Sequence, residues 1–311
     1  MDAAERELFA RSVEGAMATI DVDTALVDVG WRDALAADAR TAASILFDVQ
    51  GRTNTTSSAL DDVLLDAMGL DVDAAVILPP VGAWHPSTTG VATRALSTRA
   101  HAVVVTERDT RFVACVVPSA DITTRPIAGL DPTLGLLTAE LTGETGPIGP
   151  VSPVSSEELV DWDLVAAAGQ RALAHELLGA GRKMLELARE HALAREQFGR
   201  PISQFQAVRH RLADVLVVLE AADALVEAAW DDGLPETARM AKGFAGRATR
   251  TAIRNCQQVL AGIGFTTEHP FHRYLARALV LDQLLGSGRT LTRELGREVL
   301  QRRVLPPLVP L

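Results

Sequence analysis

Aromatic residues and cysteines are scarce in this sequence. Aromatics make up 4% of its 311 residues, and there are only two cysteines, Cys115 and Cys256. Two cysteines cannot form a disulfide framework or a cysteine-rich metal site, so we expect no metal and a reducing, cytoplasmic location. With so few rings, alanine, leucine and valine must fill the interior, which favours packing of helix on helix.

Long apolar runs and a positive net charge are also lacking. No stretch approaches the roughly 20 apolar residues that span a bilayer, and the acidic segment 1–7 does not resemble a secretory signal. Thirty basic and forty acidic side chains give a net charge of −10. This charge argues against a nucleic acid or a membrane as the main partner. The 48% of hydrophobic residues suffices for a sizeable core.

The first half of the chain is mixed in pattern. Apolar periodicity predicts helices over residues 3–20, 31–50 and 57–68, the last of them capped by Ser57 or Ser58. Beyond them, β-branched runs separated by turn residues predict a small β unit over residues 71–150. Its expected strands are 74–78, 102–106, 111–117, 122–126 and 135–141, of which the second and third form a hairpin.

The second half reads as helical. A linker rich in Gly, Pro and Ser covers residues 143–156, and Ser155 or Ser156 is a plausible start for the helix that follows. The expected helices are 157–196, 205–230, 236–261 and 271–303, the last interrupted at 286–288. The fold class is therefore α+β and predominantly α. We expect an N-terminal helical segment (1–70), a reduced β domain (71–150) and a C-terminal four-helix bundle (151–311).

One informative segment lies between the first two bundle helices, from Arg195 to Gln206. Gly199 and Pro201 force a tight turn there, which places Arg195, Phe198 and Gln206 at one end of the bundle. An arginine can bind a phosphate, while a phenylalanine and an amide suit a flat ring. The alternative is an ordinary connection in which the arginine caps a helix C-terminus.

A second informative segment runs from Gln257 to Pro270. Its small residues, including Gly262 and Gly264, allow another backbone or a ligand to approach closely, although they also simply end a helix. Glu268 and His269 are either an acid/base pair or an exposed polar turn.

Together, the two segments resemble the flavin-binding signature of the acyl-CoA dehydrogenase family. The pattern Arg-x-x-Phe-Gly-x-x-Ile-x-x-Phe-Gln spans residues 195–206, and Gln-x-x-x-Gly-x-Gly-Phe spans 258–265. The resemblance covers about half of the chain. It implies FAD as cofactor and a helical domain, a β domain and a four-helix bundle in this order. It also implies that five residues contact the FAD of a neighbouring subunit, namely Arg195, Phe198, Gln206, Gln258 and Gly262. In this interpretation Arg195 pairs with the pyrophosphate, and Gln258 and Gly262 line the adenosine end.

The chain departs from the family at the flavin ring and at the catalytic base. It is shorter than typical members, and it lacks the Glu-Pro-x-Ala-Gly-Ser-Asp loop and the Lys-x-Trp-Ile-Thr-Asn strand beside the ring. The glutamate that removes the substrate α-proton lies in the family either beside the glycine of a segment matching 282–287 or at a position matching Gly169. Here neither place carries a glutamate. Gln170 stands where an arginine often helps to hold CoA, and Glu268 and Asp282 are weak substitutes for the base.

The resemblance therefore indicates a truncated subunit of the actinobacterial, steroid- or cholesterol-catabolic type. Such a chain pairs with a full-length homologue in an α2β2 heterotetramer, whose partner subunit supplies the catalytic base. We expect α,β-dehydrogenation of a steroid-derived acyl-CoA, with a separate electron-transfer acceptor. One alternative is a non-catalytic scaffold or regulatory subunit. Another is a self-sufficient homotetramer that uses Glu268 or Asp282 as base.

Overall fold

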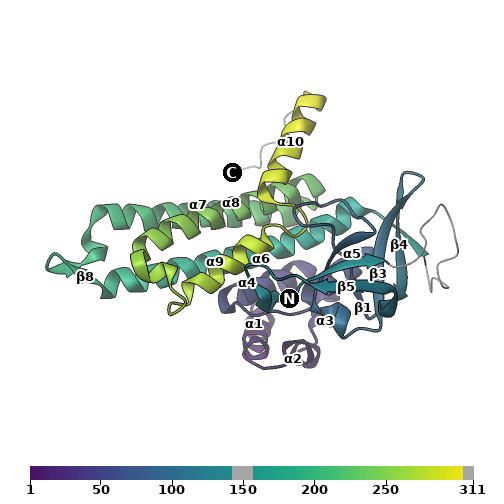
Figure 1. Ribbon diagram of the computed structural model, residues 1–311, viewed down its shortest axis with the longest axis horizontal. Coiled ribbons are helices and arrows are strands. Elements are labelled where there is room, and N and C mark those ends of the chain that lie inside the picture. Colours follow the sequence, from purple (N-terminus) through teal and green to yellow (C-terminus); the bar gives the residue numbers. More distant parts are fainter. Residues whose placement is uncertain (142–156, 304–311) are drawn as a thin grey trace.

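Long antiparallel helices form the C-terminal half of the molecule (Figure 1). The structure is a computed structural model, and it describes residues 1–141 and 157–303. The bundle helices are α6 (Trp162–Ala194), α7 (Gln206–Asp232), α8 (Pro235–Leu260), α9 (Phe271–Leu281) and α10 (Gly288–Arg302). α8 packs against α6, α7 and α10, and α9 packs against α6.

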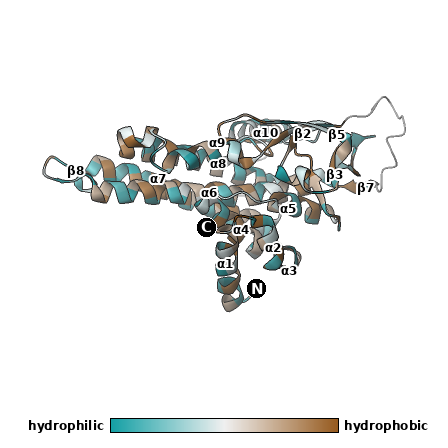
Figure 2. Cartoon of the chain, turned by 60° about the horizontal axis from the view of Figure 1, so that its bottom comes forward, coloured by the Kyte–Doolittle hydropathy of each residue, from teal (hydrophilic) through white to brown (hydrophobic). Residues whose placement is uncertain are grey.

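Small residues set the spacing of these helices. Seven of the fifteen buried residues of α8 are alanine or glycine. Hydrophobic and hydrophilic residues mix along the length of α6 and α7 (Figure 2). Where α6 crosses the N-terminal helices, a Cβ built on Gly51 would lie 2.1 Å from the Glu176 carbonyl oxygen. Glycine is therefore required at this crossing, because any side chain would push the two helices apart.

Five helices precede the β unit, and α1 to α4 lie below the bundle in Figure 1. They are α1 (Ala3–Met17), α2 (Val22–Asp28), α3 (Trp31–Ala37), α4 (Ala39–Thr53) and α5 (Ala59–Met68). Asp38 separates α3 from α4, because its carboxylate accepts a hydrogen bond from Thr41 N and caps α4. The hydrogen bond from the N-terminal ammonium group to this carboxylate lowers the pKa of Asp38 to about 2.

Two small sheets make up the β unit. The strands are β1 (Ala74–Val76), β2 (Thr89–Ala92), β3 (His101–Arg108), β4 (Arg111–Pro118), β5 (Ile122–Pro126), β6 (Leu137–Leu141) and β7 (Glu157–Val160). One sheet has the order β1-β3-β4-β7, with β1 parallel to β3 and the other pairs antiparallel; the other sheet has the antiparallel order β2-β6-β5. Alternate residues of β3 point to opposite faces. Val103 and Val105 join the core shared with the helices, while Ala102 and Val104 pack in a smaller cluster with residues of the second sheet.

A buried arginine of α9 ties the three parts together. Arg277 is 1% exposed, and its Nε lies 2.5 Å from Asp131 in the β unit. Its Nη1 donates to the Thr55 carbonyl oxygen after α4, also at 2.5 Å. Because both partners are fixed, this ion pair sets the position of α9 against both the N-terminal helices and the β unit.

The predicted fold class and the order of the elements are confirmed, while several boundaries were wrong. The hairpin, the four bundle segments and the interruption of the last helix are present. The predicted helix over 31–50 is two helices, and α2 and β2 were missed. Residues 157–160 form a strand rather than a helix start, because they pair with β4. The linker 143–156 and its proposed capping serines lie outside the described residues, and the division into three segments stays a prediction.

Candidate functional site

The two informative segments lie at the same end of the bundle. Arg195 and Gln206 flank the turn between α6 and α7, and Gln258 and Gly262 flank the end of α8. α7 and α8 are antiparallel, and Arg211 Nη1 donates to Asn255 Oδ1 at 3.3 Å near this end. The beginning of α7 therefore lies beside the end of α8.

All five residues that the resemblance indicates as FAD contacts are exposed at this end. The guanidinium group of Arg195 has no ion pair or hydrogen bond to another residue of the described ranges 1–141 and 157–303. Its positive charge contributes, after burial and His269, to lowering the pKa of His191. Within this chain Arg195 thus keeps its hydrogen-bonding capacity for another molecule.

A two-residue turn presents Phe198 to solvent. Phe198 and Gly199 have φ values of 54° and 74°, and they connect the short strands β8 (Glu196–Gln197) and β9 (Arg200–Pro201). The Phe198 side chain is 92% exposed, and its ring makes an edge contact with Phe205 at 6.1 Å between centroids. A bulky residue in the left-handed region is strained. Two successive positive φ values are the geometry of a tight hairpin turn, and this turn leaves the Phe198 ring available to another molecule.

A second strained residue precedes Gly262. Ala261 has φ 53° and ψ −135°, between α8 and the 3-10 helix η5 (Ala261–Phe265). A Cβ on Gly264 would lie 2.9 Å from Leu260 Cβ, whereas a Cβ on Gly262 would meet no atom within 4 Å. Packing within this chain therefore explains the glycine at 264 and leaves the surface at Gly262 open.

Gly169 and Leu285, at the two positions that the resemblance matches to a catalytic base, face each other in the core. A Cβ atom built on Gly169 would lie 2.4 Å from Cδ1 of Leu285 and 2.9 Å from Cδ2 of Leu64. Leu285 is fully buried, and its carbonyl oxygen accepts a hydrogen bond from Gln170 Nε2 at 3.0 Å. Aliphatic side chains thus occupy this place, and it offers no proton acceptor.

The two substitute carboxylates lie elsewhere. Glu268 is exposed in the turn before α9. Asp282 is 2% exposed, lies 2.5 Å from Arg250 Nη2 and accepts a hydrogen bond from the Gly288 backbone N–H at the start of α10. An aspartate held by an arginine and by the N-terminus of a helix is engaged in structure.

A buried lysine near Asp282 was missed from the sequence. Lys242 Nζ donates to the carbonyl oxygens of Asp282 and Gly286, at 3.1 and 3.2 Å, and so holds the turn between α9 and α10. Burial lowers its pKa to about 8. The sequence signal was a lysine within the alanine-rich apolar face of α8, between Ala241 and Ala245.

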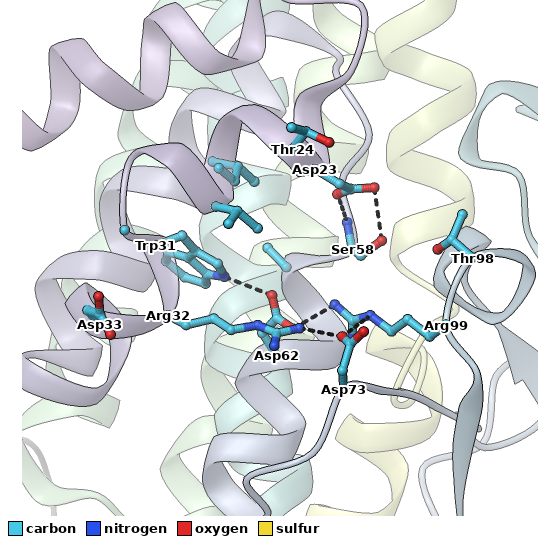
Figure 3. Close-up of a pocket in the computed structure, with 14 residues that line it drawn as sticks. Asp23, Thr24, Trp31, Arg32, Asp33, Ser58, Asp62, Asp73, Thr98 and Arg99 are labelled. Carbon is cyan, nitrogen blue, oxygen red and sulfur yellow. Dashed lines mark hydrogen bonds and ion pairs between the residues drawn. The ribbon is translucent and has the colours of Figure 1, made fainter. Parts of the chain in front are cut away.

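A cavity of about 460 Å³ lies among the N-terminal helices and the β unit (Figure 3). Four of its charged groups, Arg32, Asp62, Asp73 and Arg99, pair with one another. Asp62 accepts hydrogen bonds from Trp31 Nε1 and Arg99 Nη2, and Arg32 bridges Asp62 and Asp73. These ion pairs link α3 and α5 to the start of the β unit.

Two further findings limit the chemistry within residues 1–141 and 157–303. No group of three or more His, Cys, Asp or Glu side chains there is arranged to hold a metal ion. No helix in the same ranges combines the length and the apolar character needed to cross a membrane.

Comparison with known proteins identifies the bundle. Residues 167–300 match the family model "Acyl-CoA dehydrogenase, C-terminal domain". The acyl-CoA dehydrogenase IpdE2 of Mycobacterium tuberculosis is 38% identical over 175 residues, which cover 56% of this chain and 51% of IpdE2. FadE34 of the same organism, also an acyl-CoA dehydrogenase, is 34% identical over 72% of this chain and 31% of its own length. The chain thus spans about half or less of these relatives.

Solved structures share the fold along nearly the whole chain. The ChsE4–ChsE5 complex from Mycobacterium tuberculosis has a TM-score of 0.75 at 20% identity and covers 99% of both chains. The steroid ACAD Tcur3481–Tcur3483 has a TM-score of 0.71 at 20% identity, over 96% of this chain and 98% of its own. These likenesses establish the fold, including the reduced β unit.

Proposed function

Because this chain belongs, through its C-terminal half, to the acyl-CoA dehydrogenase family, we propose that it is one subunit of a heteromeric FAD-dependent acyl-CoA dehydrogenase. The complex carries out α,β-dehydrogenation of a steroid-derived acyl-CoA thioester. A full-length homologue is the partner subunit and supplies the catalytic base, and a separate electron-transfer protein accepts the electrons.

The contact between Gly169 and Leu285 carries this proposal. Both positions at which the family places a base are apolar and buried here, and Leu64 helps to fill the space between them. The flavin-contact motifs at the bundle end are nevertheless retained and exposed. A chain with such contacts and without a base is suited to complete a site on another subunit.

The residues at the bundle end fit the adenosine half of FAD. Arg195 offers an unpaired guanidinium group for the pyrophosphate, Gln206 and Gln258 offer amides, and Gly262 leaves room for a flat group. Phe198 adds an exposed aromatic face. When bound, FAD supplies the hydride acceptor for the substrate β-carbon. The role of this chain is to bind and orient the cofactor, because the residues at its own base position cannot accept a proton.

The names of related proteins support the substrate class and the partner. Tcur3481–Tcur3483 is described as a steroid ACAD, and ChsE4–ChsE5 is described as a complex. IpdE2 and FadE34 are acyl-CoA dehydrogenases of an actinobacterium. By analogy with these names, the proposal takes a steroid-derived substrate and a second subunit.

A scaffold subunit that only stabilises a full-length enzyme is the second candidate, because the filled base position fits it equally well. The free guanidinium group of Arg195 favours the first candidate, since a scaffold has no use for an unpaired arginine beside a strained phenylalanine.

Co-expression with a full-length homologue tests the proposal. We expect the complex to contain flavin, detected by its visible absorbance, and to oxidise acyl-CoA, whereas the chain alone carries no flavin. If this chain is only a scaffold, replacing Arg195 should leave the flavin content of the complex unchanged. A yellow, active assembly made from this chain alone would contradict both candidates.

A further inference from the structure

Three histidines lie near Arg195, at the end of the bundle that carries the candidate flavin contacts. His191 is in the last turn of α6, four positions before Arg195, so the two side chains lie on the same face of the helix end. His269 and His272 lie at the start of α9, which packs against α6 and is joined to the end of α8 by η5. All three histidines are half-buried.

His269 is held as a neutral hydrogen-bond donor. Its Nδ1 accepts from the Phe271 backbone N–H at 3.2 Å, and an imidazole nitrogen that accepts carries no proton. The proton of the neutral ring is therefore on Nε2, and a second proton on Nδ1 would break the bond to Phe271. Burial and the nearby His272 lower the pKa of His269, which agrees with a neutral ring.

His191 can change its charge without losing a partner. Its imidazole has no hydrogen bond or ion pair in the part of the chain that the structure describes. The groups that face it are His269 from the start of α9 and Arg195 from the turn after α6, and together with burial they lower its pKa below the ordinary 6.5. The acidic residues next to these groups in sequence, Glu190 and Glu268, are exposed. His191 therefore lies among positive rather than negative neighbours.

We propose that His191 and His269 join Arg195 in binding a pyrophosphate diester, and that His191 takes up a proton when this anion binds. The role rests on the proposed function, since a pyrophosphate diester is the central group of FAD. The Nε2–H of His269 and the guanidinium group of Arg195 supply donors that stay the same as the pH changes. A diester lacks the second ionisation that phosphate monoesters have near pH 6, so its charges are constant while His191 titrates.

Anion binding then depends on pH. In the free chain the pKa of His191 lies below 6.5, and a bound anion raises it because opposite charges favour the protonated form. The affinity therefore increases as the pH falls through the pKa of the bound state, and it levels off below the pKa of the free state. A pKa that is about one unit higher in the bound state corresponds to an affinity about tenfold higher at the acidic limit.

Titration of FAD into the stripped complex, near pH 5 and near pH 8, tests the proposal. We expect about tenfold tighter binding at the lower pH in the wild type, and less than about twofold in His191→Gln. His269→Asn keeps an acceptor for Phe271 but loses the outer donor, so it should weaken binding about fivefold at both pH values. His101→Gln, at an exposed position of β3, is the matched control and should keep the wild-type pH dependence.

ADP-ribose separates this proposal from the proposed function, because it contains the pyrophosphate diester and no flavin. Added to the full chain, it should raise the pKa of His191, measured by NMR, by about one unit. If the complex bound no FAD at either pH while ADP-ribose had this effect, the proposed function would fail and the histidine site would stand. A pKa of His191 that ADP-ribose leaves unchanged would overturn the proposal, as would an equal pH dependence of FAD affinity in wild type and His191→Gln.

Discussion

Gly169 of α6 and Leu285 of the turn before α10 share one space in the core. A Cβ on Gly169 would lie 2.4 Å from the Leu285 Cδ1 atom. The glycine and the leucine are therefore coupled, because the leucine can be buried here only while residue 169 has no side chain.

Gly169→Ala should consequently destabilise the chain. The added methyl group forces Leu285 or Leu64 to move, and such overpacking costs about 1–3 kcal/mol. Gly15→Ala, in an open helical position, should instead stabilise by about 0.5–1 kcal/mol through helix propensity. Urea denaturation of the two variants measures both effects, and a stabilised Gly169→Ala variant would show that the space is open.

Arg195→Ala should weaken flavin binding in the complex. Loss of a charge-assisted hydrogen bond of about 1.5–3 kcal/mol corresponds to roughly tenfold to hundredfold weaker retention of FAD. Arg195→Lys should restore it only partly, since lysine cannot form a bidentate contact. Titration of FAD into the stripped complex measures the affinity, with Arg297→Ala on α10 as an exposed-arginine control. An unchanged affinity in Arg195→Ala would make this residue a mere helix cap.

Ala261→Gly should stabilise the chain by about 1 kcal/mol, because glycine adopts a positive φ without strain. The control Ala213→Gly, at an exposed helical position of α7, should destabilise by about 0.5–1 kcal/mol. Thermal unfolding distinguishes the two signs. Destabilisation by both changes would mean that the backbone at residue 261 is unstrained.

Glu176 should make stability depend on pH. Burial raises its pKa from 4.5 to about 7, against the opposing effects of Arg277 and of a hydrogen bond with Gln50. The folded chain therefore holds the proton more tightly than the unfolded chain, and the resulting stabilisation is complete below pH 4.5 and lost as the pH rises through about 7. Relative to Glu176→Gln, the wild-type free energy of unfolding should fall on the order of 3 kcal/mol over this interval.

Urea titrations across the pH range measure this difference. Glu190→Gln, an exposed position of the same helix, is the control and should follow the wild-type pH profile. If the difference between wild type and Glu176→Gln stayed constant with pH, Glu176 would not titrate in this interval.

Local patterns were sufficient to predict the elements that pack through their own periodicity. The alanine- and leucine-rich stripes predicted α7 and α8 to within a few residues, and the β-branched runs predicted β3 and β4. Strands that depend on distant partners were not predictable in this way. The strand β7 is formed by pairing of residues 157–160 with β4, and Asp38 divides a continuous helical pattern because its side chain caps the second helix.

The candidate site was predictable only as a set of residue types. Spacing and connection lengths placed Arg195 and Gln206 at one end of the bundle, where the structure has them. Two long-range contacts could be found only in the folded structure. One is the packing of Gly169 against Leu285, which lies 116 positions away in the sequence, and the other is the ion pair between Asp282 and Arg250. Long-range contacts of this kind leave no local pattern in the sequence.

The location of the catalytic base is the most direct test of the whole account. In the complex, Glu268→Gln and Asp282→Asn should each lower kcat by far less than the factor of about 10²–10⁴ that loss of a general base costs. Asp282→Asn should mainly destabilise the fold, because Arg250 loses its buried partner; kcat is therefore expressed per bound flavin. Replacing the active-site glutamate of the partner subunit by glutamine should abolish turnover while flavin absorbance is retained. Abolished turnover in Glu268→Gln with FAD still bound would contradict the account and assign the base to this chain.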